Sequence, residues 1–218
     1  MSKNIEKISA SDESECRQLI TLTQVNDPGI MFFSPDAAKR VYHTMRMITA
    51  VSSLLNKFSH KYMIKDKNKV AAIAMWIPPG KMFSNWDFIR AGFLLIPFIM
   101  GMRVFRQIIK FLDIAIRLQE EHMKNREHWH LFYMAVHYSY QRQDYGQKVL
   151  SNIIHESDRT GKPIFVQVFT EEYVNFYQKI GFKLLSRTKF SDQCIMNCMI
   201  REAFEKRKPL KSTAKKTR

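Results

Sequence analysis

Hydrophobic positions along the chain switch between strand-like alternation and a helix-like spacing of three to four residues. Alternating or continuous apolar runs predict strands at residues 4–9, 62–64, 70–76, 131–136, 164–169, 182–185 and 194–200. Helix-like spacing predicts helices at residues 11–25, 35–58, between 146 and 161, and 171–180, with a long helical region at 82–124. Such interleaving indicates an α/β chain, with a mixed sheet covered on both faces and strand 131–136 near its centre.

Capping and breaking residues set the predicted boundaries. Ser11 is expected to cap the first helix, and the Asn-Asp-Pro-Gly segment at 26–29 is expected to end it. The long region at 82–124 is expected to break at Pro97 and Gly101. We interpret this region as a helical insert in the sheet domain.

Charge divides the chain into two parts. The 218 residues contain 35 Lys and Arg against 20 Asp and Glu, a formal net charge of +15. Seven of the positive charges lie in residues 206–218, which contain no acid, so residues 1–205 carry the other +8. We therefore predict one domain at 1–205 and a basic, disordered tail at 206–218. The excess charge favours an anionic ligand, and we expect no nucleic-acid partner except through the tail.

The cysteines and the apolar segments bear on location. Three cysteines, an odd number, indicate a reducing compartment and no disulfide scaffold. The longest uncharged apolar stretch, residues 91–102, is interrupted by proline and is shorter than the roughly 20 residues that span a bilayer. No Cys and His set has metal-ligand spacing. We expect a cytoplasmic protein with no membrane partner and no metal.

The most informative junction follows the apolar strand 131–136. A polar loop at 137–146 leads from this strand into a helix. Backbone N–H groups and the helix dipole at such a junction favour an anion, and a diphosphate is a suitable one. The alternative is a plain strand-to-helix turn.

Several motifs around this junction resemble one family. They are Gln141-Arg-Gln-Asp-Tyr-Gly146, Gly161-Lys-Pro163, Asn175-Phe-Tyr177 and Gly181-Phe182. In this order, they are similar to the coenzyme A-binding core of the GNAT N-acetyltransferases. The puromycin-type bacterial branch is most similar, and Trp76-Ile-Pro-Pro-Gly80 matches a motif common in that branch. The resemblance is strongest over about residues 128–183. It implies a GNAT fold with a mixed, mostly antiparallel sheet.

The resemblance also implies a function. A transferase of this family moves an acetyl group from acetyl-CoA, its co-substrate, to a primary amine of a small molecule by direct attack in a ternary complex. The implied coenzyme-binding residues are Met134, Ala135, Val136, Gln141, Arg142, Gln143, Asp144, Tyr145, Gly146, Gln147 and Asn175.

The resemblance implies Tyr177 as a catalytic residue, and the position of His137 in the sequence suggests it as a second one. Tyr177 would protonate the departing thiolate, although its place on the apolar stripe of its helix also suits a core tyrosine. His137 lies just after the central strand, and histidine is the side-chain type that ordinarily exchanges protons near neutral pH, so it is a candidate to accept the proton of the amine. The alternative is an exposed loop histidine without a catalytic role. Glu171 and Glu172 are alternatives, although they also suit the start of a helix.

Three departures from the family pattern support an alternative function. Arg142 and Asp144 stand where the family usually has glycines, Gln167 stands where this branch commonly has a carboxylate, and Tyr173 takes the place of an asparagine. An amide cannot act as a base at neutral pH. The alternative is therefore a catalytically degenerate GNAT-fold protein that binds coenzyme A or, through its tail, nucleic acid.

The helical insert has two interpretations. In the resembling branch the corresponding region lies near the acceptor site, which predicts a lid whose apolar wall receives the acceptor. The other interpretation is a helical layer that packs on the sheet and offers a face for a homodimer. The apolar residues concerned are Trp86, Phe88, Phe93, Leu94, Phe98, Met100, Met102 and Phe105.

Overall fold

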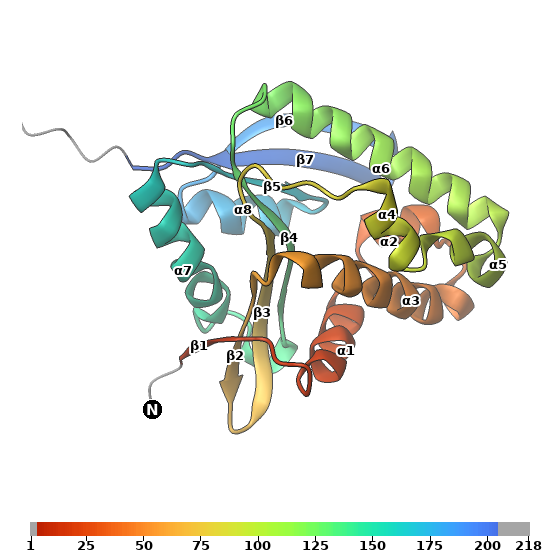
Figure 1. The fold of residues 1–218 in the computed structure, drawn as a ribbon, viewed down its shortest axis with the longest axis horizontal. Helices are drawn as coiled ribbons and strands as arrows, with labels where there is room; N and C mark the ends of the chain where they lie inside the picture. The colour runs from red at the N-terminus through yellow and green to blue at the C-terminus, as the bar shows by residue number, and fades with distance from the viewer. Residues whose placement is uncertain (1–3, 205–218) are drawn as a thin grey trace, which may run out of the picture.

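The computed structural model describes residues 4–204, so the predicted tail at 206–218 lies outside the described residues. One sheet contains all seven described strands in the order β1-β2-β3-β4-β5-β7-β6 (Figure 1). The strands are β1 Ile5–Lys7, β2 Lys61–Asp66, β3 Lys69–Ile77, β4 Trp129–Val136, β5 Ile164–Val168, β6 Lys183–Ser191 and β7 Cys194–Arg201. Every pairing is antiparallel except that of β4 with β5, and β4 is central, which confirms the predicted mixed sheet.

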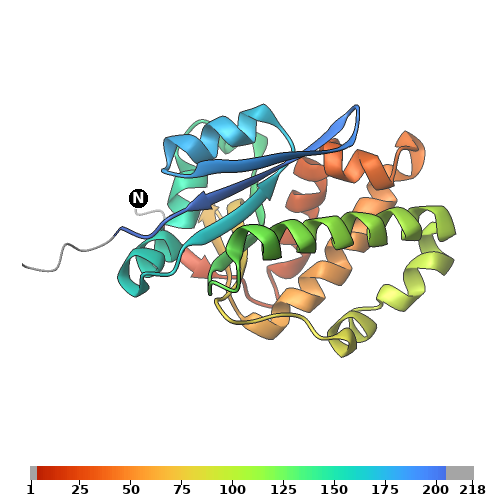
Figure 2. The same ribbon diagram turned by 90° about the horizontal axis from the view of Figure 1, so that it is seen from above.

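The helices cover both faces of this sheet (Figures 1 and 2). They are α1 Glu13–Gln24, α2 Pro28–Phe33, α3 Ala37–Leu55, α4 Asn85–Arg90, α5 Ile96–Met100, α6 Met102–Met123, α7 Tyr145–Thr160 and α8 Glu171–Lys179. Short 3-10 turns are η1 Asn56–Phe58, η2 Phe93–Leu95 and η3 Tyr138–Tyr140.

Strand β3 shows how the two faces are filled. Ile73 and Met75 pack into a core with α1, α2, α3 and the insert, whereas Ala72, Ala74 and Trp76 pack into a second core with α7 and α8. Successive side chains of a strand point to opposite faces, so a strand buried on both sides has a continuous apolar sequence. The apolar run at 70–76 is unbroken because both faces of β3 are buried.

Helix α6 covers the β5–β7 part of the sheet. Its Met123 packs in a third core with Phe165 of β5 and with Met196 and Cys198 of β7. The predicted apolar face of the last strand is thus confirmed, because Cys194, Met196, Cys198 and Ile200 are all buried.

Two local predictions are wrong, and a third is incomplete. Asp12, not Ser11, precedes α1, and its carboxylate accepts hydrogen bonds from Ser9 and Lys65. Residues 26–29 end α1 but also begin α2, because the Asp27 carboxylate accepts a hydrogen bond from the Gly29 N–H and Pro28 occupies the first helical position. Pro97 likewise lies in the first turn of α5 and does not break the insert.

The breaks in the insert lie instead at two glycines with left-handed backbone. Gly92 has φ of 83° and Gly101 has φ of 87°. Gly101 separates α5 from α6, as predicted, because a residue without Cβ enters this region of φ at no steric cost.

Candidate functional site

The central strands separate halfway along their length. Strands β4 and β5 pair only through Trp129–Ile164, His130–Phe165 and Leu131–Val166, although β4 continues to Val136. Beyond Leu131 the edge of β4 that faces β5 has no strand partner, whereas its other edge still pairs with β3. This opening exposes backbone hydrogen-bonding groups in the middle of the sheet.

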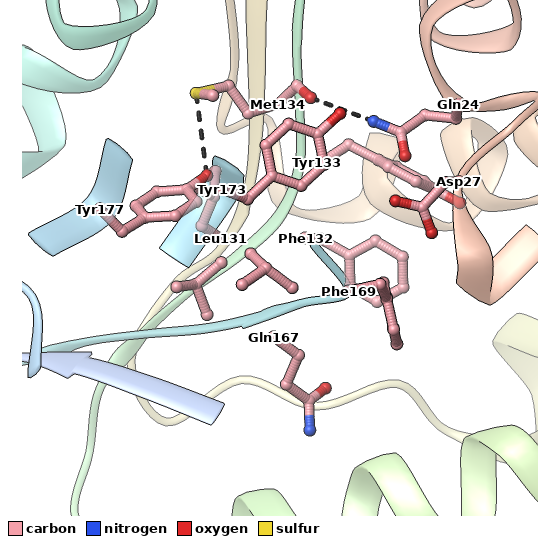
Figure 3. Close-up of a pocket in the computed structure, with 12 residues that line it drawn as sticks. Gln24, Asp27, Leu131, Phe132, Tyr133, Met134, Gln167, Phe169, Tyr173 and Tyr177 are labelled. Atoms are coloured by element: carbon pink, nitrogen blue, oxygen red, sulfur yellow. Dashed lines mark hydrogen bonds between the residues drawn. The ribbon is translucent and has the colours of Figure 1, made fainter. Parts of the chain in front are cut away.

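A cavity of about 90 Å³ lies at this opening (Figure 3). Strand β4, strand β5 and the segment after it, helix α8 and the α1–α2 junction line the cavity. The lining residues are Gln24, Asp27, Leu131, Phe132, Tyr133, Met134, Val166, Gln167, Val168, Phe169, Tyr173 and Tyr177. Five of the twelve are aromatic, so the cavity has apolar walls with a few polar groups, as small-molecule sites do.

Tyr177 reaches the cavity from α8. Its side chain is 3% exposed, and its hydroxyl donates to the Met134 thioether sulfur on β4 over 3.8 Å. Burial raises the pKa of this phenol well above its usual value of about 10. The predicted acid is therefore at the strand opening and keeps its proton at neutral pH.

Asp27 is a site residue that the sequence analysis missed. This carboxylate is 8% exposed, lines the cavity, and accepts a hydrogen bond of 2.8 Å from the Gly29 N–H. Burial raises its pKa to about 6, although the backbone hydrogen bonds of Gly29 and Ile30 act in the opposite direction. A carboxylate with this pKa can accept a proton near neutral pH.

Two tyrosines of the cavity lie within electrostatic reach of Asp27. The pKa of Tyr173 is raised to about 12, first by burial and then by the charge of Asp27. Burial and the same charge raise the pKa of Tyr133. Both phenols are neutral at physiological pH. Asp27 is the one carboxylate among the described residues that line the cavity, so it is the group there that carries a negative charge when ionised.

The Gln167 amide has a structural partner. Its Nε2 donates to the Ala115 carbonyl of α6 over 2.9 Å, and Figure 3 shows the side chain directed away from Tyr177. Gln167 therefore joins the sheet to the insert.

The predicted phosphate loop has the backbone that the motif requires. Arg142 and Asp144 both have left-handed conformation, with φ of 60° and 61°. They thus adopt the region of φ that glycines enter most easily, and asparagine and aspartate tolerate it better than most residues. Asp144 precedes α7 without a side-chain cap, and the dipole of that 16-residue helix favours an anion at its start.

The rest of the predicted loop surrounds this helix start. Gln141, Gln143 and Gln147 are exposed, and Tyr145 is buried. Gly146 is packed so closely that an added Cβ would lie 3.2 Å from Cζ of Phe176. The start of α7 is therefore held directly against α8.

Backbone carbonyls at the free edge of β4 already accept hydrogen bonds from side chains. Met134 O accepts from Gln24 Nε2 at 3.5 Å, as Figure 3 shows, and Val136 O accepts from Gln141 Nε2 at 3.2 Å. Ala135 between them is buried in the core. The predicted pantetheine segment 134–136 thus presents acceptors to the opening between the strands.

Other predicted residues lie away from the cavity. His137 accepts a hydrogen bond from the Ser139 N–H, and its ring lies 4.1 Å from that of Tyr138. Asn175 is exposed on α8, and Glu171 forms an ion pair with Arg187. The structure therefore brings Tyr177 to the strand opening but provides no contact there for His137, Asn175 or Glu171.

The insert does not form the expected wall. None of the apolar insert residues named as candidates lines the cavity. Phe93 and Met100 are buried in the core beside α3, whereas Trp86 and Phe98 face outward. The packing interpretation is correct for the inward residues, and the lid interpretation has no support in this geometry.

Residues 4–204 lack two kinds of feature. This part of the chain contains no group of three or more His, Cys, Asp or Glu side chains placed to hold a metal. Within the same residues, no helix has both the length and the apolarity to cross a bilayer.

Comparisons with known proteins agree with the fold. Residues 102–184 match the acetyltransferase (GNAT) domain family. A probable serine/threonine-protein kinase of Dictyostelium discoideum is 25% identical over 134 residues, which cover 58% of this chain and 14% of that protein. An uncharacterized N-acetyltransferase of Schizosaccharomyces pombe is 24% identical over 147 residues, covering 64% of this chain and 60% of that protein. The chain thus spans less than two thirds of either relative.

A solved structure extends the likeness to nearly the whole chain. The Corynebacterium glutamicum protein described as a histone acetyltransferase and related acetyltransferase has a TM-score of 0.60 and 14% identity, over 94% of this chain and 99% of that one. The separated central strands, the helix start at Asp144 and this superposition lead to one assignment. The chain has the GNAT fold, and its residues 102–184 match the GNAT acetyltransferase domain.

Proposed function

We propose that this protein transfers an acetyl group from acetyl-CoA to a primary amine of a small molecule, by direct attack within a ternary complex. One observation carries the proposal: the protonated hydroxyl of Tyr177 is buried where β4 and β5 separate, in a cavity that also holds Asp27. A proton donor and a proton acceptor at one strand opening are what acyl transfer to an amine needs.

The residues present fit the coenzyme. The acceptors at Met134 and Val136 suit the amide groups of a pantetheine arm. The start of α7, with left-handed Arg142 and Asp144, suits a diphosphate. Bound acetyl-CoA would supply the reactive thioester. No metal is part of the proposal.

The protein's own groups then move two protons. The Asp27 carboxylate accepts a proton from the amine, whose nitrogen forms a bond to the acetyl carbon. As the carbon–sulfur bond breaks, Tyr177 donates its hydroxyl proton to the sulfur. Asp27 takes the role that the sequence analysis assigned to His137, because Asp27 lines the cavity and His137 does not.

A second candidate function is supported by Asp144. Its carboxylate is exposed at the start of α7, where it would repel a diphosphate. Under this alternative the GNAT fold binds a coenzyme without catalysis, or binds nucleic acid through the tail.

Isothermal calorimetry with acetyl-CoA, followed by an assay of thiol release with a panel of primary amines, tests the proposal. We expect binding and amine-dependent release of free coenzyme A. Absence of binding at millimolar acetyl-CoA would disprove the enzymatic function. Binding without release for any amine would favour the second candidate.

Finer features belong to the same proposal. They are the single domain at 1–205, the puromycin-type branch, a bacterial source and a cytoplasmic location. The cytoplasmic location is supported by Cys16, Cys194 and Cys198, which are all free and buried.

A further inference from the structure

Large apolar side chains project from one end of the molecule. We call them the apolar end; its members are Met82, Trp86, Leu94, Leu95, Phe98, Ile99 and Met102. Phe98 is 87% exposed, Met82 73% and Trp86 70%. Figures 1 and 2 show α4 and α5, which carry much of the apolar end, at the periphery of the molecule, away from the sheet. Exposed apolar residues gathered in this way mark an interaction site.

The exposure is not explained by packing inside the chain. The short helices of the insert are two-sided: Phe93, Ile96 and Met100 are buried in the core, whereas Leu94, Leu95 and Phe98 face outward. The outward residues do not line the cavity beside Tyr177. The apolar end therefore serves neither the core nor the proposed active site.

The segment that carries the apolar end also carries positive charges. Its exposed cationic residues are Lys81, Arg90, Arg103, Arg106 and Lys110. The only acid between residues 80 and 112 is Asp87, and it forms an ion pair with Lys57 at 2.6 Å. A second copy of the chain, docked through the same surface, would bring its own lysines and arginines close to these cations, and the like charges would repel each other. The charge therefore favours a partner that is apolar and anionic at once.

We propose that the apolar end docks this protein on the surface of an anionic lipid membrane. The apolar side chains enter the boundary between headgroups and acyl chains, while the arginines and lysines contact lipid phosphates. A hollow of about 470 Å³ between α3 and α5, lined by Lys39, Tyr42 and Ile99 among others, adjoins the apolar end and offers space for one headgroup. Docking of this kind requires no membrane-spanning helix.

The tryptophans allow a direct test in the full chain. The protein has three, and Trp76 and Trp129 are 0% and 6% exposed, whereas Trp86 is 70% exposed. Vesicles of phosphatidylcholine mixed with phosphatidylglycerol should shift the Trp86 emission to shorter wavelength, and brominated acyl chains should quench it. Vesicles of phosphatidylcholine alone should bind far more weakly. No shift and no quenching with the anionic vesicles would overturn the proposal.

Matched variants locate the contact. Phe98→Ser should lower vesicle partitioning at least about tenfold in co-sedimentation, because the variant lacks the aromatic side chain that the bound protein would bury in the membrane. Leu22→Ser, at a side chain 66% exposed on α1, should leave partitioning unchanged. Equal partitioning of the Phe98→Ser variant and the unmodified protein would also overturn the proposal.

Vesicle binding through the basic tail and self-association through the apolar end each predict a different result. Replacing Lys211, Lys215 and Lys216 by Gln weakens any attraction through the tail, and the quenching of Trp86 should persist. Loss of that quenching in the tail variant would assign the binding to the tail and refute the proposal. So would a concentration-dependent dimer in sedimentation velocity that Phe98→Ser abolishes, because the apolar end would then bind a second copy.

Discussion

The hydroxyl of Tyr177 on α8 lies 3.8 Å from the thioether sulfur of Met134 on β4, beside the opening between β4 and β5. Sulfur is a weak acceptor, so this hydrogen bond is weak and the hydroxyl can readily turn to a better acceptor. A thiolate arriving at the same place would be a much stronger acceptor. The pair therefore gives the phenol its orientation and leaves the proton available.

Removal of this hydroxyl tests the role of Tyr177. We expect Tyr177→Phe to lower turnover by roughly 10²–10⁴-fold while acetyl-CoA affinity stays nearly constant, because only the proton donor is lost. Steady-state thiol release and calorimetry measure the two effects. The control is Tyr62→Phe, which removes a half-buried hydroxyl on β2 that is hydrogen-bonded to the His60 ring and does not line the cavity. This variant should be active. Full activity of Tyr177→Phe would refute the acid role.

Asp27 and Asp36 form a matched pair for testing the proton acceptor. Each carboxylate caps the N-terminus of a helix, accepting from Gly29 N–H and Ala38 N–H respectively, but only Asp27 lines the cavity. We expect Asp27→Asn to lower kcat/KM about 10²-fold or more, whereas Asp36→Asn should have little effect, since asparagine also caps helices well.

The pH profile sharpens this test. The base must be ionised, and the pKa of Asp27 is about 6, so kcat/KM should fall as pH drops below about 6. Asp27→Asn should remove that decline from whatever activity remains. If kcat/KM of the variant still falls below about pH 6 as in the unmodified protein, a group other than Asp27 causes the decline.

The raised pKa of Asp27 also predicts a trend in stability. A carboxyl whose pKa is raised from 3.8 to about 6 by folding stabilises the fold when protonated. This contribution is complete below about pH 4 and is lost as pH rises through about 6. Urea unfolding between these values should show a decrease in the free energy of unfolding that is smaller in Asp27→Asn. Identical slopes would contradict the burial of this charge.

Asp144→Gly tests the phosphate loop. Glycine keeps the left-handed conformation, with φ of 61°, and removes a carboxylate from the start of α7. We expect coenzyme A to bind several-fold more tightly, as calorimetry would show. Asn68→Gly replaces another left-handed residue, with φ of 63°, in the distant β2–β3 turn and should leave binding unchanged. Weaker binding by Asp144→Gly would mean that Asp144 contributes favourably to the site.

The sheet was largely predictable from periodicity. Burial on both faces of β3 gives a continuous apolar run, and in β7 Cys194, Met196 and Cys198 alternate on one buried face while Asn197 and Met199 are buried on the other. These patterns depend only on which neighbours each strand has. The left-handed backbone at Arg142 and Asp144 was predictable as well, because both residues stand where the resembling family usually has glycines.

Other features of the site depend on distant contacts. Helix α2 has six residues, too few for a periodic signal, and its first two residues, Pro28 and Gly29, belong to a motif that also ends helices. Asp27 becomes a site residue only because the start of α2 places it in the same cavity as residues of β4 and α8. The proximity of His137 to the strand end suggested a base, but the 3-10 turn at 138–140 directs its ring onto Tyr138. The Asn-Asp-Pro signature of a helix start was the available clue to Asp27.

The two edges of the sheet have a consequence for how the protein behaves at high concentration. Strand β1 is only three residues long, and β6 carries Lys183, Arg187 and Lys189 on its exposed face. Short or positively charged edge strands resist the addition of a strand from another molecule. The fold therefore blocks growth into extended β-aggregates at both ends of its sheet, even in a protein that exposes many apolar side chains elsewhere.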